Sequence, residues 1–115
     1  MTLHVLFLDL VDDAELIAEY RHWHRPGGIP SEIAAAIRAA GVEEMEIFQR
    51  DDRMVMLMRT GPGFDPAAKA AADAADPATM AWERLMSRFQ KPLASAKSGE
   101  KWLPAERIFA LSQQP

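Results

Sequence analysis

One short segment constrains the fold more than any other part of this 115-residue chain. In the sequence RMVMLMR, from Arg53 to Arg59, an apolar side chain occupies every interior position. Because successive side chains of a β-strand point to opposite faces, the three methionines share one face, and Val55 and Leu57 share the other. Both faces of the sheet that contains this strand are therefore apolar, and other parts of the protein must cover both.

This strand is the second half of a predicted β-hairpin. The first half, Glu44–Gln49, is joined to it by the polar turn Arg50-Asp51-Asp52. Leu3–Val11 is rich in Val, Leu and Phe and predicts a buried strand, and Arg107–Leu111 predicts a short final one.

Helical patterns fill the intervals between these strands. Leu16, Ile17, Tyr20 and Trp23 recur at helical spacing, which predicts a helix from Ala14 to about His24. The other expected helices run from about Ser31 to Ala40, from Asp65-Pro66 onward (Ala-rich and weak), and from Asp76-Pro77 onward (stronger). At the two Asp-Pro pairs the Asp suits the N-cap and the Pro suits the first helical position.

The order of elements predicts an α+β fold in a single domain, residues 1–115. Read as β-α-α-β-β-α-β, it corresponds to a ferredoxin-like split βαβ subunit. One layer of helices covers only one face of so small a sheet, so a second subunit is the economical cover for the other. We therefore expect a homodimer in which two sheets pack face to face.

Composition and charge exclude several classes of protein. The formal net charge is −4, with Lys and Arg scattered along the chain, so a nucleic-acid partner is not expected. Cysteine is absent, which excludes disulfides and thiol chemistry. The apolar run LHVLFLDLV is too short to span a bilayer and does not resemble a signal peptide. We expect a cytoplasmic protein without a membrane partner.

The stretch EYRHWHRPGGIPSEI, from Glu19 to Ile33, holds the candidate catalytic residue. Tyr20 and His24 are four residues apart and so share one face of the first helix. His24 lies in its last turn, where the following glycines allow a ligand to approach the backbone closely, and an imidazole exchanges protons near neutral pH. The alternative interpretation is that His24 only complements the helix dipole and that Tyr20 belongs to the core.

The remaining histidines do not predict a metal site. We expect His4 to be a hydrogen-bonded histidine of the sheet and His22 to meet solvent, on a different helix face from His24. No two histidines have the i, i+4 spacing of a helical zinc site, and there is no H-E-x-x-H sequence. No metal is therefore expected.

Two tryptophans are candidates for the wall of a pocket. Trp82 lies on the apolar stripe of the last helix, so it fits either the core or a surface on which a sugar ring stacks. Trp102 lies in a segment without periodic pattern and fits either the cover of a cleft or a contact with a second subunit.

Over most of its length the sequence resembles the L-rhamnose mutarotase family. The similarity is carried by Y-x-x-x-H in EYRHWHRPGGIPSEI, by AAIRAAGVEEMEIFQRDDRMVMLM, and by WERLMSRFQKPL and EKWLPAERIFAL. It implies a dimeric α/β barrel of ferredoxin-like subunits. The implied activity interconverts the α and β anomers of a deoxy-hexose such as L-rhamnose, without a cofactor.

The resemblance also implies roles for three residues. His24 corresponds to the family's proton donor, Tyr20 to a substrate-contacting tyrosine, and Trp82 to the second residue of a tryptophan pair that packs on the sugar. The sequence departs from the family where Met45 replaces a second tyrosine and Ala81 replaces the first tryptophan. An L-fucose-type sugar fits as well as L-rhamnose, and water, Tyr20 or Glu32 could serve as the base.

Two other functions fit the same pattern. A cofactor-independent monooxygenase of the dimeric α/β-barrel kind would use the methionine-rich strand as the wall of an apolar cavity. A non-catalytic small-molecule-binding module would have no need of His24.

Overall fold

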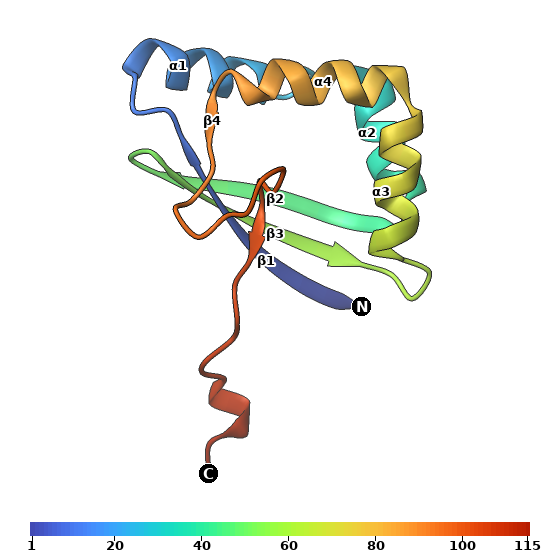
Figure 1. Cartoon of the computed structure of the whole chain (residues 1–115). Helices are drawn as coiled ribbons and strands as arrows, with labels where there is room; N and C mark the ends of the chain where they lie inside the picture. The colour runs from blue at the N-terminus through green and yellow to red at the C-terminus, as the bar shows by residue number, and fades with distance from the viewer.

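In the computed structural model, which describes all 115 residues, the chain forms four α-helices and five strands (Figure 1). In chain order these are β1 (Thr2–Leu10), α1 (Ala14–Trp23), α2 (Ser31–Ala39), β2 (Val42–Arg50), β3 (Arg53–Thr60), α3 (Pro66–Ala75), α4 (Pro77–Ser87), β4 (Gln90–Lys91) and β5 (Leu103–Pro104). A short 3-10 helix, Leu111–Gln113, follows near the C-terminus. No helix combines the length and apolar character needed to cross a membrane.

The strands form one antiparallel sheet in the order β2-β3-β1-β4, and β5 also pairs with β1. The pairing of β1 with β3 is continuous from Thr2 opposite Thr60 to Asp9 opposite Arg53. All four helices lie on one side of this sheet (Figure 1). The α+β, ferredoxin-like arrangement expected from the sequence is confirmed.

Local sequence signals set the ends of three helices. The side chain of Asp13 accepts a hydrogen bond from the Leu16 amide at the start of α1. Asp65 and Asp76 accept hydrogen bonds from the first-turn amides of α3 and α4, each followed by a proline in the first turn. Both Asp-Pro helix starts were therefore predicted correctly, because the cap and the proline act locally.

The helix-facing side of the sheet contributes two groups of buried residues. The larger, between β1, β3, α1 and α4, contains Leu8, Leu10, Tyr20, Met54, Met86 and Phe89. The smaller contains Val42, Met56 and Met58. The three methionines of β3 share one face, as the alternation predicted, and this face meets the helices.

The opposite face of the sheet has no cover within one chain. Val55 and Leu57 of β3 point to this side and are only partly buried, and Phe48 of β2 is half exposed (51%). Leu3 of β1, at 52% exposed, lies on the same face. The expectation of two apolar faces is confirmed.

The predicted final strand, Arg107–Leu111, is wrong. The edge of β1 is paired instead with the two-residue strands β4 and β5, and the last backbone bond to β1 is from the Ala105 amide to the Val5 carbonyl (2.7 Å). Beyond that point the chain leaves the sheet and extends away from the body (Figure 1), with Ile108 94% exposed. The residues have the composition of a strand, but within one chain no strand lies beside them.

We predict that Phe89→Ala lowers the free energy of unfolding by roughly 3–5 kcal/mol, because Phe89 is 1% exposed in the larger buried group and truncation leaves a cavity. Chemical denaturation measures the change. Met80→Ala on α4 is the control, since Met80 is 40% exposed and should cost well under about 1 kcal/mol. Equal losses in the two variants would contradict this description of the core.

Candidate active site

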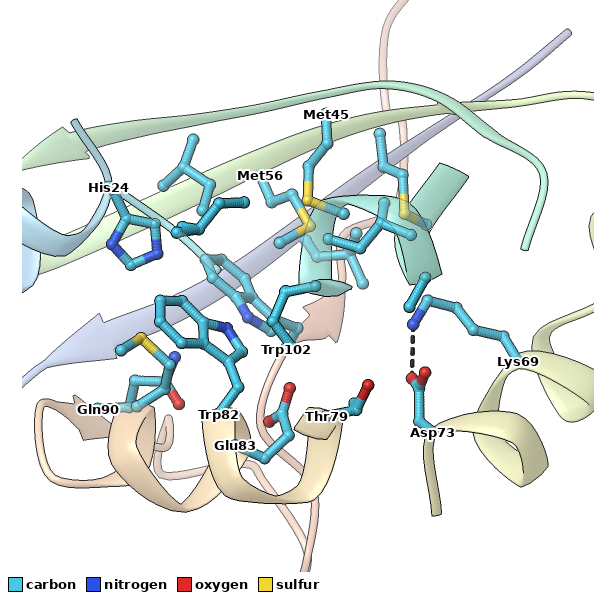
Figure 2. Close-up of a pocket in the computed structure, with 18 of the residues that line it drawn as sticks. His24, Met45, Met56, Lys69, Asp73, Thr79, Trp82, Glu83, Gln90 and Trp102 are labelled. Atoms are coloured by element: carbon cyan, nitrogen blue, oxygen red, sulfur yellow. Dashed lines mark hydrogen bonds and ion pairs between the residues drawn. The ribbon is translucent and has the colours of Figure 1, made fainter. Parts of the chain in front are cut away.

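A cavity of about 290 Å³ lies between the sheet and the helices (Figure 2). This volume is near the lower end of the roughly 300–1,000 Å³ typical of small-molecule sites, so it suits a single ring better than a dinucleotide or a polymer. The sheet provides an apolar floor, made of Leu6, Met45, Ile47, Met56 and Met58. The polar groups come from the helices and from the start of β4.

His24 follows the last residue of α1 and lines the cavity. Its Nδ1 lies 2.7 Å from the carbonyl oxygen of Tyr20, one turn earlier. Because a carbonyl only accepts, Nδ1 carries the proton and Nε2 is left with a free lone pair. Nε2 has no hydrogen-bond partner in the chain, which makes it the nitrogen available to a ligand.

Aromatic contacts hold the ring of His24 in place. It stacks on Tyr20, with ring centroids 4.2 Å apart and planes 29° apart, and lies 5.8 Å from the ring of Trp82. By total surface the residue is exposed, yet its ring lies against these two side chains. The free edge of the imidazole therefore meets a cavity that is open to solvent.

Burial lowers the pKa of His24 below its ordinary value of 6.5, and the hydrogen bond to the Tyr20 carbonyl only partly opposes this effect. The imidazole is consequently neutral at neutral pH. A neutral ring with a fixed tautomer begins a reaction as a proton acceptor, and it becomes a donor once it has gained a proton.

The backbone after His24 is held close to the helix. Gly27 has a φ of 74°, in the region that favours glycine. A side chain at Gly28 would clash with the carbonyl oxygens of Trp23 and Arg25, so only glycine permits this close approach. The glycine pair thus turns the chain sharply beside His24 and leads it into α2.

Tyr20 is both a core residue and a cavity residue. It is 4% exposed, and its hydroxyl accepts a hydrogen bond from Gln90 Nε2 at 3.4 Å. Burial raises the pKa of Tyr20 and the nearby charge of Glu83 adds to the rise, whereas the bond from Gln90 opposes it. The hydroxyl therefore stays protonated, which favours a hydrogen-bonding role over that of a base.

Two other expectations about the site have a clear outcome. Trp82 lines the cavity, and its ring also packs edge-on against Trp23, outside the lining, at 5.8 Å between ring centroids. Glu32, one of the carboxylates considered as a base, is exposed and does not line the cavity.

The departures from the family pattern also have definite positions. Met45 lies in the floor of the cavity, where a tyrosine would have placed a hydroxyl. Ala81 is exposed on α4 and does not line the cavity. Of the two adjacent positions 81 and 82, only Trp82 therefore contributes an indole to the cavity.

The sequence interpretation missed several polar residues of the cavity. Lys69 and Asp73 form an i, i+4 ion pair on α3, facing the end of the cavity that also contains Thr79 and Glu83 of α4 (Figure 2). Gln90, at the start of β4, has its Oε1 buried without a partner. The i, i+4 spacing was readable, but only tertiary packing shows which face of α3 meets α4.

The other histidines are placed as expected. His4 Nε2 is 2.9 Å from Thr60 Oγ1 across the β1–β3 pairing, and His22 is exposed. No group of three or more His, Asp or Glu side chains is arranged to hold a metal ion.

Comparison with known proteins identifies the family. The profile of the L-rhamnose mutarotase family matches residues 4–111. The chain belongs to the L-rhamnose mutarotase family. It is 58% identical over 106 residues to the L-fucose mutarotase of Xanthomonas campestris pv. campestris, an alignment that covers 92% of this chain and 85% of that protein. The family resemblance inferred from the sequence is confirmed.

Solved structures share the fold of this family member at low sequence identity. The L-rhamnose mutarotase FA22100 of Formosa agariphila matches with a TM-score of 0.69 and 14% identity, covering 96% of this chain and 99% of that one. Tetracenomycin F2 cyclase of Streptomyces glaucescens matches with a TM-score of 0.58 and 18% identity, covering 96% of each chain. The same architecture thus occurs in proteins named for different reactions.

We predict that NMR titration of His24 gives a midpoint below the ordinary value of 6.5. In the neutral ring, the ¹⁵N shifts should show the proton on Nδ1 and none on Nε2. Because folding disfavours the charged ring, the unfolded chain takes up this proton at a higher pH than the folded protein. The free energy of unfolding should therefore decrease as the pH falls below 6.5. His22, whose ring makes no hydrogen bond, is the internal reference for the tautomer. A His24 proton on Nε2, or a raised midpoint, would contradict this geometry.

Proposed function

We propose that this protein interconverts the α and β anomers of an L-deoxy-hexose, with L-fucose the first sugar to test and L-rhamnose the second. One observation carries the proposal: the neutral imidazole of His24, its tautomer fixed by the Tyr20 carbonyl, offers Nε2 to a cavity of monosaccharide size. Membership of a family of sugar mutarotases, which are isomerases, supports the reaction. The 58% identity to a protein named L-fucose mutarotase supports the choice of sugar.

The reaction moves one proton between two oxygens that are bonded to the same carbon. His24 Nε2 takes the proton of the anomeric hydroxyl, the bond between C1 and the ring oxygen breaks, and an aldehyde forms. The imidazolium then gives its proton to the former ring oxygen. Rotation about the C1–C2 bond and closure from the other face, with the proton transfers reversed, give the opposite anomer.

One histidine is sufficient for this sequence. Both oxygens are attached to C1, so the same nitrogen reaches each in turn, first as base and then as the acid expected from the family. Carbon is neither oxidised nor reduced overall, and the reaction therefore requires no redox cofactor. Positioned acid–base catalysis contributes roughly 10²–10⁴-fold, which is the rate increase that we assign to His24.

The other lining residues supply orientation. The indole of Trp82, beside His24, offers a flat apolar face to the C–H groups of a sugar ring. The hydroxyl of Tyr20, held by Gln90, is a neutral hydrogen-bonding group for a sugar hydroxyl. The apolar floor of methionine, leucine and isoleucine suits the methyl group of a deoxy-hexose better than a hydroxymethyl group.

We also propose that the working form is a homodimer in which the outer faces of two sheets pack together into an α/β barrel. Phe48, Val55 and Leu57 give this face its apolar surface, and it lies uncovered in one chain. The C-terminal segment, with Ile108 and Phe109 exposed, extends away from the body and offers further apolar side chains to a second subunit. The cytoplasm stays our prediction for its location.

We predict that the protein accelerates anomer exchange of L-fucose, L-rhamnose or both, measured as saturation transfer between the anomeric NMR signals. His24→Ala should lower kcat/KM by at least about 100-fold, because the proton-transfer group is lost. His22→Ala is the matched control: it lies on the same helix, is exposed, and should leave the rate unchanged. In the wild type, kcat/KM should fall at acidic pH as His24 becomes protonated.

Other outcomes would point to the alternatives. No acceleration across a panel of deoxy-hexoses would reject the catalytic proposal. Sugar binding that survives His24→Ala without any wild-type catalysis would favour a non-catalytic binding module. Oxygen consumption with an electron-rich aromatic substrate would favour the monooxygenase.

For the dimer, we predict a mass twice the 12.8 kDa of one chain in sedimentation equilibrium. Leu57→Glu should shift the protein to the monomer, because it buries a charge between the two sheets. Ala70→Glu adds the same charge to an exposed position of α3 and should leave the dimer intact. A monomeric wild type, or a Leu57→Glu protein that stays dimeric, would contradict this interface.

A further inference from the structure

The segment after β4 returns to the cavity and places Trp102 in its wall. Trp102 comes from a part of the chain distant from α1 and α4, yet it lines the same cavity as His24 and Trp82 (Figure 2). It is partly buried and packs against both buried groups of the helix-facing side.

Lys101 fastens this segment to α4. Its Nζ donates to Ser87 Oγ at 2.7 Å and to both the carbonyl oxygen and Oε2 of Glu83 at 3.2 Å. These three bonds join the residue before Trp102 to the helix that contains Trp82. Lys101 also neutralises Glu83, whose carboxylate faces the cavity beside Thr79.

The residue after Trp102 is fixed as well. Leu103 of β5 pairs with Phe7 of β1, and the Ala105 amide donates to the Val5 carbonyl at 2.7 Å. Trp102 therefore lies between two anchored residues: Lys101 is hydrogen-bonded to α4, and Leu103 is paired with β1. A side chain held in this way loses little conformational entropy when a ligand binds, which raises affinity.

We infer that Trp102 is the second aromatic wall of the sugar site and that Lys101 is the positioning residue that holds it there. The inference rests on the proposed mutarotase function. Since Ala81 is exposed and lies outside the cavity, α4 brings a single indole, and the C-terminal segment supplies the other. The site thus takes its two aromatic faces from separate elements instead of from adjacent residues of one helix.

This assignment differs from a purely structural role in its effect on kinetics. Aromatic contacts contribute about 0.5–1.5 kcal/mol beyond burial. A lost wall should therefore raise KM roughly 2- to 13-fold and leave kcat within about 2-fold, because His24 is untouched. A residue that only filled the core would alter thermal stability without separating KM from kcat.

The experiment measures KM and kcat by NMR anomer exchange for Trp102→Leu, Trp102→Phe, Lys101→Met and Lys101→Arg, with thermal unfolding of each variant. We expect a raised KM in Trp102→Leu and an intermediate KM in Trp102→Phe. Lys101→Met should also raise KM, whereas Lys101→Arg should keep it close to the wild-type value. Trp23→Phe is the matched control, since Trp23 packs on Trp82 but does not line the cavity.

Trp102→Phe keeps an aromatic core residue, so it remains informative if Trp102→Leu does not fold. A second readout is tryptophan emission during sugar titration in the Trp23→Phe background, where adding Trp102→Phe should remove part of the sugar-dependent change. Active wild type with unchanged KM in both Trp102 variants would overturn the inference and leave the proposed function standing. Inactive wild type that binds no sugar would remove both.

Discussion

The structure depends on a sheet that is apolar on both faces. Its inner face supports the helices and forms the floor of the cavity, because Met56 and Met58 of β3 contribute both to a buried group and to the lining. Its outer face, with Val55 and Leu57, is left without cover in one chain. The alternation of side chains along one strand thus links the site inside the subunit to the surface available for association outside it.

At the edge of this floor, the end of α1 fixes the tautomer of His24, and burial lowers its pKa. Both effects suit the imidazole to proton transfer. Near the C-terminus of α1, the Tyr20 carbonyl accepts a backbone hydrogen bond from the His24 amide at 3.3 Å and a second, shorter one from His24 Nδ1 at 2.7 Å. Burial then lowers the pKa of His24 and keeps the imidazole neutral, while the ring stacks on Tyr20. The close turn at Gly28, where a side chain would clash with the Trp23 and Arg25 carbonyls, follows directly after the ring. The hydrogen bond from the ring to the helix end therefore also fixes the tautomer of His24.

Much of the cavity is assembled from residues that are distant in sequence. Trp82 comes from α4, Lys69 and Asp73 from α3, and Trp102 from the segment before β5. Methionine dominates the floor, and its flexible side chain adapts to ligands of different shape. This composition is consistent with a family that is named for L-rhamnose and to which a relative named L-fucose mutarotase is similar.

The sequence alone determined the strands of the hairpin, both Asp-Pro helix starts and the Tyr20–His24 pair, because caps, turns and periodicity act over a few residues. It also indicated the family, and the resemblance to that family indicated the position of Trp82 in the cavity wall. Tertiary structure decided the rest. The segment 107–111 has strand composition but no neighbouring strand in one chain, so it leaves the sheet. Gln90, Glu83 and Trp102 reach the cavity only because α4 and the C-terminal segment pack where they do, and no local pattern encodes which surfaces of distant elements will meet.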